Sequence, residues 1–229
     1  MSALLVILAA TFGASAAAFL PRLAYRLAVP FGSPPRSTCG SCGLELTTWV
    51  RVGAFCRCSR GYAVTTVAGA AVATVLAVEI GASPLLPVYL LAMVPGLLLA
   101  MIDLRCLRLP DPFVGLLAVV AGGPLIMLRP GRIGVALVAS VLVVTAYGLI
   151  ALMPGGGLGL GDVKLAGVLA FVLGFSGWPA VVAGLVAPHL INGPIALALL
   201  LTRRASRRRA IPFGPALLAG ALIAVVTAA

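Results

Sequence analysis

A glycine-rich stretch lies between two long apolar segments of the chain and reads Pro154-Gly-Gly-Gly-Leu-Gly-Leu-Gly-Asp-Val-Lys164. Glycine permits backbone conformations and close approaches that any side chain would block, so the stretch predicts a tight, open loop. The loop ends at Asp162, where the sequence becomes apolar again. A carboxylate beside a membrane-spanning segment is costly unless it is functional, is paired or caps a helix. The simplest interpretation of Asp162 is a cap, because an acid at a helix start accepts hydrogen bonds from free N–H groups and complements the helix dipole.

The apolar segments around this loop belong to a chain that is poor in charge. Of its 229 residues, 62% are hydrophobic and only 9% are charged, whereas about a quarter of a soluble domain is charged. Several apolar runs have the length of about 20 residues that a helix needs to cross the bilayer. The sequence therefore predicts an all-α fold, a polytopic transmembrane helical bundle in contact with lipid. The expected spans, about eight in number, are 3–20, 62–82, 84–102, 112–128, 133–153, 163–176, 178–201 and 211–228.

These spans divide the chain into three expected parts. Residues 1–20 form the first transmembrane helix, residues 21–61 form a small cysteine-rich cytoplasmic loop, and residues 62–229 form the transmembrane core. A cleaved signal peptide is the weaker interpretation of 1–20. The basic residues Arg22 and Arg26 follow the apolar run, whereas a signal peptide carries its basic residues before that run.

The basic residues indicate how the bundle is oriented. The net charge is +11, but the arginines occur in short clusters between apolar runs. That pattern excludes a nucleic-acid partner and favours topology signals and contact with anionic lipid. With the N-terminus outside, fourteen of the sixteen basic residues are cytoplasmic, and only Arg129 and Arg132 are not. The positive-inside rule favours this orientation, which also places Asp103, Asp111 and Asp162 at the cytoplasmic face.

Four of the five cysteines lie in the loop 21–61, as Cys39, Cys42, Cys56 and Cys58. Two close pairs of cysteines predict a structural zinc site with four thiolate ligands. Disulfide bonds between these cysteines are the alternative, but the reducing cytoplasm disfavours them. The second pair is Cys-x-Cys, tighter than a usual zinc knuckle, so incidental cysteines stay an alternative.

Two further acids lie near the end of the third expected helix. Asp103 is attached to its C-terminal end, where the helix dipole disfavours an anion. An ion pair with Arg105 or Arg108 is the structural alternative to a functional role. Asp111 precedes Pro112, and this pair predicts a helix N-cap followed by a proline in the first turn.

Polar residues also occur inside the seventh expected helix. His189 and Asn192 lie near Pro188, Gly193 and Pro194. Polar groups in such positions usually stabilise a kink or a hydrogen bond between helices. We therefore expect structural roles for both.

Asp103 and Asp162 are the two acids whose positions favour chemistry. Two carboxylates that approach closely cannot both ionise, so they share a proton near neutral pH. One then acts as a general base on a water molecule, while the other polarises a carbonyl and later donates a proton. Such a pair hydrolyses a peptide bond without a covalent intermediate.

The motifs around these acids resemble those of the type IV prepilin peptidases, the leader peptidases of pili and type II secretion. Gly159-Leu-Gly161-Asp162-Val-Lys164-Leu matches the family's GxGD signature, and Asp103 matches its first catalytic aspartate. Further matches are Phe19-Leu-Pro-Arg-Leu-Ala-Tyr-Arg26, Pro212-Phe-Gly-Pro215 and the four loop cysteines. The resemblance covers nearly the whole chain.

The resemblance implies a membrane-embedded aspartic endopeptidase of the bacterial inner membrane, with its active site toward the cytoplasm. Asp103 and Asp162 would be catalytic, and Gly159, Gly161 and Lys164 would belong to the active-site loop. The implied partners are prepilins or pseudopilins with a short basic leader, a glycine before the cut and an apolar helix after it. The implied metal is the zinc of the cysteine loop.

Many members of that family also methylate the new N-terminus with S-adenosylmethionine. Here the second cysteine pair is contracted, and the segment 61–66 carries no acid where the family commonly has a glutamate, so proteolysis is favoured over methylation. Two other functions stay open. A small transporter would carry its acids within the spans, and a non-catalytic assembly component of a pilus or secretion system would not need both aspartates. The particular pilin and the oligomeric state are not indicated.

Overall fold

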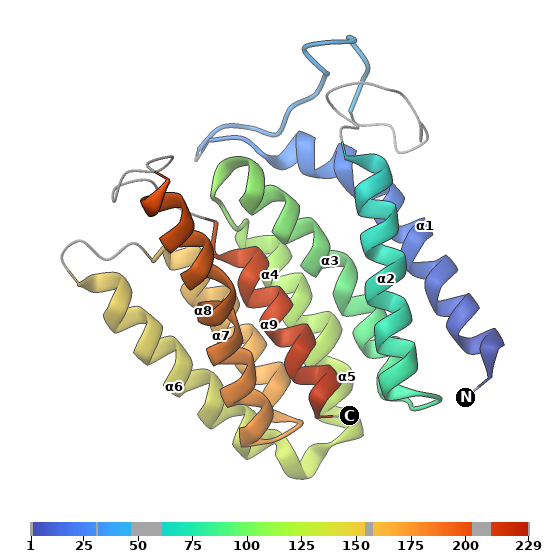
Figure 1. The fold of residues 1–229 in the computed structure, drawn as a ribbon, viewed down its shortest axis with the longest axis vertical. Helices are drawn as coiled ribbons and strands as arrows, with labels where there is room; N and C mark the ends of the chain where they lie inside the picture. Colours follow the sequence, from blue (N-terminus) through green and yellow to red (C-terminus); the bar gives the residue numbers. More distant parts are fainter. Residues whose placement is uncertain (1, 31, 47–60, 154–157, 203–211, 229) are drawn as a thin grey trace. The chain divides into compact units, whose positions relative to one another are not determined.

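A computed structural model shows the chain as two compact units, Met1–Arg108 and Leu109–Ala229. The structure describes residues 2–30, 32–46, 61–153, 158–202 and 212–228 (Figure 1). Within these ranges the regular structure is helical, apart from one β-bridge between Thr38 and Glu45.

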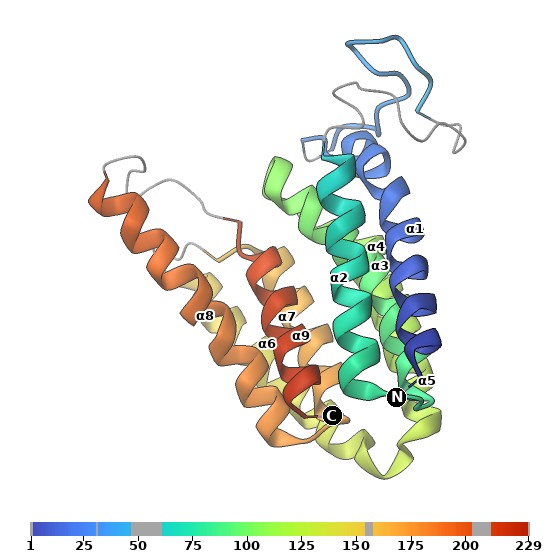
Figure 2. The same cartoon turned by 45° about the vertical axis from the view of Figure 1, so that its right-hand side comes forward.

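The first unit contains three helices, α1 (Ala3–Leu27), α2 (Tyr62–Ile80) and α3 (Leu85–Cys106). They lie side by side in both ribbon views (Figure 2). Helices α1 and α2 cross at Gly13 and Gly69, where a Cβ atom on Gly13 would lie 2.3 Å from the Gly69 carbonyl oxygen. Only glycine permits backbones to approach so closely, as is typical of helix pairs in membranes.

Helix α1 continues beyond residue 20, where the sequence predicts its end, and runs through Pro21 to Leu27. Leu20, Pro21 and Ala24 are all buried, so the packed face of the helix extends across the proline. Membrane helices tolerate proline because neighbouring groups satisfy the backbone atoms that it frees. The expected loop 21–61 therefore begins as helix.

The second unit contains the remaining helices. An apolar helix is built from α4 and α5 with a π-helical turn, η2, between them, and the short 3-10 turn η3 leads into α6. The elements are α4 (Asp111–Leu117), η2 (Ala118–Gly122), α5 (Gly123–Leu128), η3 (Pro130–Arg132), α6 (Ile133–Leu152), α7 (Leu160–Gly174), α8 (Trp178–Leu201) and α9 (Gly214–Thr227).

Helix α7 is the most enclosed helix of the second unit, because it packs against α6, α8, α9 and η2. The Ser140 hydroxyl on α6 donates to the Gly167 carbonyl at 3.0 Å. A Cβ atom on Gly174 would lie 2.4 Å from the Cα of Ala136, also on α6, and one on Gly184 of α8 would lie 2.3 Å from Leu173 of α7. Small residues therefore bring two neighbouring helices close to α7.

The predicted fold class, an all-α polytopic membrane bundle, is confirmed. Six helical segments among the described residues are long and apolar enough to cross a membrane. Helices α7 and α9 are shorter, at 15 and 14 residues. A helix of 15 residues is about 22 Å long, less than the hydrocarbon thickness of about 30 Å. Of the eight predicted spans, these two therefore lie within the bundle without the length to cross a bilayer alone.

Candidate functional site

Asp162 lies in the first turn of α7. Residues 154–157 of the predicted glycine loop before it lie outside the described residues. Its backbone N–H donates to the carbonyl of Gly159 at 3.0 Å, and its Oδ2 accepts the Gly159 N–H at 3.3 Å. Gly159 is the N-cap residue, but glycine has no side chain, so only the Asp162 half of a capping box exists. The carboxylate is half-buried and lies at the positive end of the helix dipole, as the cap interpretation predicts.

The two glycines of the Gly159-Leu-Gly161 motif have steric reasons for being glycine. A Cβ atom on Gly159 would lie 3.2 Å from Oδ2 of Asp162, and one on Gly161 would lie 3.2 Å from the Cβ of Leu109. A side chain at Gly159 would thus crowd the carboxylate, and one at Gly161 would separate α7 from the segment that precedes α4. Both glycines position Asp162.

Lys164 connects α7 to α4 through an ion pair. Its Nζ donates to Oδ2 of Asp111 at 2.7 Å, and the two side chains are 55% and 65% exposed. The prediction that Asp111 is an N-cap is wrong. The N-cap residue is Pro110, and Asp111 begins the helix, so its carboxylate reaches across to α7 instead.

A second contact holds the same apolar helix against α7. A Cβ atom on Gly122, at the end of the π-helical turn η2, would lie 2.8 Å from Cε1 of Phe171. The Phe171 ring also packs edge-on against Phe175, with 5.2 Å between ring centroids. Single π-helical turns inside helices occur frequently at functional sites, and here the turn admits an aromatic ring of α7.

An aromatic cluster that sequence reasoning missed joins α6, α8 and the start of α9. The ring centroids of Tyr147 and His189 are 6.0 Å apart, those of His189 and Phe213 are 5.4 Å apart, and those of Tyr147 and Phe213 are 6.4 Å apart. Phe213 belongs to the Pro212-Phe-Gly-Pro215 motif. Tyr147 is a lone tyrosine in an apolar run, and no pattern in the sequence singles it out.

Asn192 bonds to a segment outside its own helix, whereas the His189 bond stays within α8. His189 Nδ1 lies 2.8 Å from the Leu185 carbonyl of its own helix. Because a carbonyl only accepts, Nδ1 carries the proton. Asn192 donates to the Pro212 carbonyl at 3.5 Å, from α8 to the segment before α9.

Asp103 lies in the last turn of α3, in the first unit. Only 4% of its surface is exposed. Arg105 donates to the carbonyl of Pro21 at 3.0 Å, and Arg108 donates to the carbonyls of Val29 and Pro30 at 3.3 and 3.1 Å. The segment around this acid is therefore held to the end of α1 and to the residues that follow it.

The two predicted catalytic acids belong to different units. Asp103 is part of Met1–Arg108, and Asp162 is part of Leu109–Ala229. Their pairing stays a prediction.

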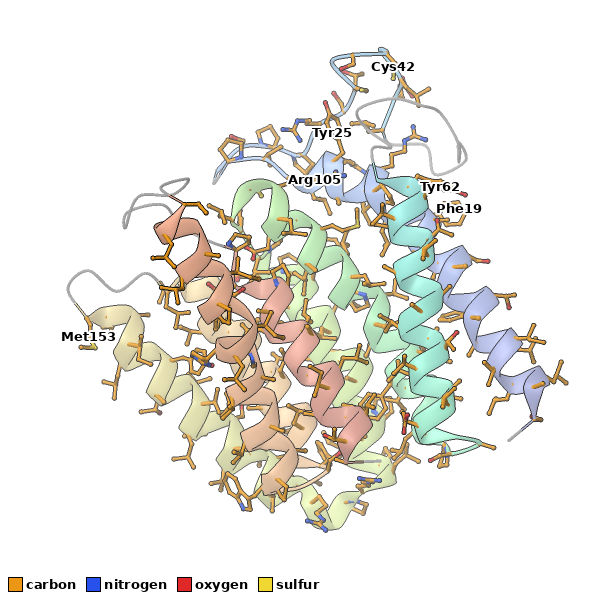
Figure 3. The ribbon with its side chains drawn as sticks, viewed as in Figure 1. Phe19, Tyr25, Cys42, Tyr62, Arg105 and Met153 are labelled. Atoms are coloured by element: carbon orange, nitrogen blue, oxygen red, sulfur yellow. The ribbon has the colours of Figure 1, made fainter. Side chains whose placement is uncertain are left out.

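Two of the four predicted zinc ligands, Cys39 and Cys42, lie in one turn. Cys39 donates its N–H to the Leu44 carbonyl and accepts the Gly43 N–H at its own carbonyl, both at 2.9 Å, and Gly43 has a φ of +64°. Figure 3 shows Cys42 in the segment beyond the helix ends. Cys39 is 1% exposed and packs with Leu46 and Tyr25, whereas Cys42 is exposed.

The other two predicted ligands, Cys56 and Cys58, lie outside the described residues. The zinc site therefore stays a prediction. If all four thiolates bind one ion, the metal would cross-link the segment between α1 and α2.

Comparison with known proteins gives one partial likeness. The prepilin leader peptidase/N-methyltransferase of Bacillus subtilis (strain 168) is 38% identical to this chain over 76 residues, which are 33% of this chain. The match spans 29% of that relative's length. No family model and no solved structure matches the chain.

Proposed function

We propose that this chain is a membrane-embedded aspartic endopeptidase that removes the basic leader from type IV prepilins or pseudopilins. The observation that carries the proposal is that two carboxylates lie at helix ends: Asp103 is 4% exposed in the last turn of α3, and Asp162 is in the first turn of α7. Beside Asp162, a side chain at Gly159 would crowd the carboxylate. The partial likeness to a prepilin leader peptidase supports the same class of substrate.

In this proposal Asp103 and Asp162 act together on one water molecule. One carboxylate takes a proton from the water, and the water oxygen attacks the scissile carbonyl carbon. The other, protonated, donates a hydrogen bond to the carbonyl oxygen. The C–N bond then breaks as the departing nitrogen takes up a proton, which leaves a free acid on the leader and a free amine on the pilin.

The location of both acids suits a substrate that is charged on one side of the cut and apolar on the other. Asp103 lies in the last turn of α3 and Asp162 in the first turn of α7, so neither is in the middle of an apolar helix. A basic leader would stay in water at the proposed cytoplasmic face of the inner membrane, while the apolar helix would stay in lipid. If a cysteine introduced into segment 203–209 could be labelled from the periplasm, this orientation would be wrong.

The decisive experiment is cleavage of a labelled prepilin by purified protein in proteoliposomes, followed by N-terminal sequencing of the product. Asp103→Asn and Asp162→Asn are each expected to abolish cleavage at normal expression. The matched control is Glu79→Gln, which makes the same chemical change on an exposed residue of α2 and is expected to retain activity. Cleavage by Asp162→Asn at an appreciable rate would show that the two-carboxylate mechanism is wrong.

Methylation of the new N-terminus is a second proposed activity, and it is favoured by the partial likeness to a leader peptidase that is also an N-methyltransferase. S-adenosylmethionine would supply the methyl group. Mass spectrometry of the cleaved pilin, with and without S-adenosylmethionine, separates a peptidase from a peptidase that also methylates. A transporter or a non-catalytic assembly component would give neither product.

A further inference from the structure

The hydroxyl group of Tyr147 is a buried polar group without a hydrogen-bond partner among the described residues. The tyrosine lies on α6 and is 6% exposed, and its hydroxyl oxygen is buried. Most buried polar groups in proteins are hydrogen-bonded, because an unmade hydrogen bond away from water costs free energy. A buried hydroxyl that lacks a partner beside a proposed active site is therefore a candidate to bond a ligand.

The register of α6 against α7 places Tyr147 near Asp162. A Cβ atom on Gly174 would contact Ala136, and one on Gly167 would lie 2.4 Å from Cγ2 of Val144, so the two helices run antiparallel. Three residues onward from Val144 is Tyr147, and three residues back from Gly167 is Lys164. Each step is about 4.5 Å toward the same end of the helix pair, so Tyr147 lies level with Lys164, just past the first turn of α7 that holds Asp162.

Two further observations agree with this placement. Tyr147 lies close enough to Asp162 to interact electrostatically with its carboxylate. The rings of His189 and Phe213 pack against the tyrosine ring, and His189 directs its Nδ1–H to the Leu185 carbonyl. The aromatic cluster therefore holds the tyrosine ring in place beside the proposed site and leaves its hydroxyl for another acceptor.

An extended substrate would bring the missing acceptor. A peptide that is cut at the edge of the membrane must unwind around the scissile bond, and its carbonyls then lose their helical hydrogen bonds. In a medium without water each such carbonyl needs a new donor. Tyr147 belongs to a membrane-length helix, at the level where the substrate's apolar segment would begin.

We propose that the Tyr147 hydroxyl donates a hydrogen bond to a backbone carbonyl of the substrate, on the apolar side of the cut. This inference rests on the proposed peptidase function. The Tyr147 hydroxyl has no hydrogen-bond partner in the described structure. The substrate carbonyl loses its own partner when the peptide unwinds, so the new bond would satisfy both groups. It exists only with substrate bound, so its loss would affect substrate binding and leave the folding of the protein unharmed.

The test is Tyr147→Phe, which removes the hydroxyl and keeps the ring contacts. Cleavage of a labelled prepilin should show kcat/KM reduced about five- to tenfold, the effect of one hydrogen bond to a neutral acceptor, mainly through a higher KM. The thermal midpoint of the variant without substrate should equal or exceed that of the wild type, because the buried hydroxyl no longer lacks a partner. The matched control is Tyr89→Phe, the same change on a 7% exposed tyrosine near the start of α3, which should cleave normally.

The outcomes separate this inference from the proposed function. If the wild type does not cut prepilin, the peptidase proposal fails and the inference fails with it. If the wild type cuts and Tyr147→Phe cuts equally well, only the inference is wrong. A lower thermal midpoint for Tyr147→Phe would also overturn it, because the hydroxyl would then be bonded within the fold or to a buried water.

Discussion

The two predicted catalytic acids occupy opposite kinds of helix end. Asp162 begins α7, where free N–H groups and the positive end of the dipole stabilise an anion, and it accepts the Gly159 N–H. Asp103 ends α3, where the dipole disfavours an anion, and it is 4% exposed. Local structure thus explains an acid at Asp162 without any appeal to catalysis. The helix dipole alone does not favour an acid at Asp103.

The largest expected effect is on the dyad itself. Asp103→Asn and Asp162→Asn should each reduce cleavage about 10³-fold, within the range for general acid–base catalysis. The double variant should be no worse than either single variant, because residues that act as a unit are not additive. Multiplicative losses in the cleavage assay would mean that the acids act separately.

Thermal unfolding of the same two variants sharpens the contrast between the helix ends. Asp162→Asn should lose a dipole interaction of about 0.3–1 kcal/mol, whereas Asp103→Asn should be relieved of an unfavourable one of similar size. The ranking of the two thermal midpoints is the measurement. If Asp103→Asn were the less stable variant, the helix dipole would not be the dominant influence on these acids.

The second largest effect concerns zinc and distinguishes the two units. All five cysteines lie between residues 39 and 106, so metal removal should act on the first unit. We expect about one zinc per chain, as for a four-ligand structural site, and none in a Cys39→Ser, Cys42→Ser double variant. Cys106→Ser is the control, since Cys106 donates to the Ile102 carbonyl within α3. Unchanged metal content in the double variant would mean that the loop cysteines are incidental.

A smaller effect is expected at the glycines that position Asp162. Gly161→Ala would push against Leu109 and displace the start of α7, so we expect about a tenfold loss of kcat/KM, since small misplacements of catalytic groups are costly. Gly134→Ala is the control, because a Cβ atom there meets nothing within 4 Å. Equal cleavage by both variants would show that the close approach at Gly161 is not needed.

The smallest effect is expected at the ion pair between Asp111 and Lys164. Exposed pairs contribute about 0.2–1 kcal/mol, and both side chains are more than half exposed. Asp111→Asn should therefore keep substantial activity, and a double-mutant cycle with Lys164→Met should give a coupling energy in that range. A dead Asp111→Asn variant beside an active Asp103→Asn variant would identify Asp111 as the first acid of the dyad.

The amino-acid sequence was sufficient for the helices and for the position of Asp162. Long apolar runs have one stable form in lipid, because a helix satisfies its own backbone hydrogen bonds. Glycines before an acid similarly indicate a loop followed by a helix start, and Asp162 is found in the first turn of α7. These features depend on residues that are neighbours in sequence.

Only the tertiary structure decided which groups meet across helices. Asp111 has the sequence context of a cap, yet its carboxylate binds Lys164, 53 positions away along the chain. Helix α1 passes Pro21 because its buried face continues to Ala24. Tyr147 looks like any tyrosine in an apolar run, and its hydroxyl is buried because α6 packs against its neighbours. Burial and pairing are set by helix packing, which sums weak contacts between distant residues, and no local pattern encodes that sum.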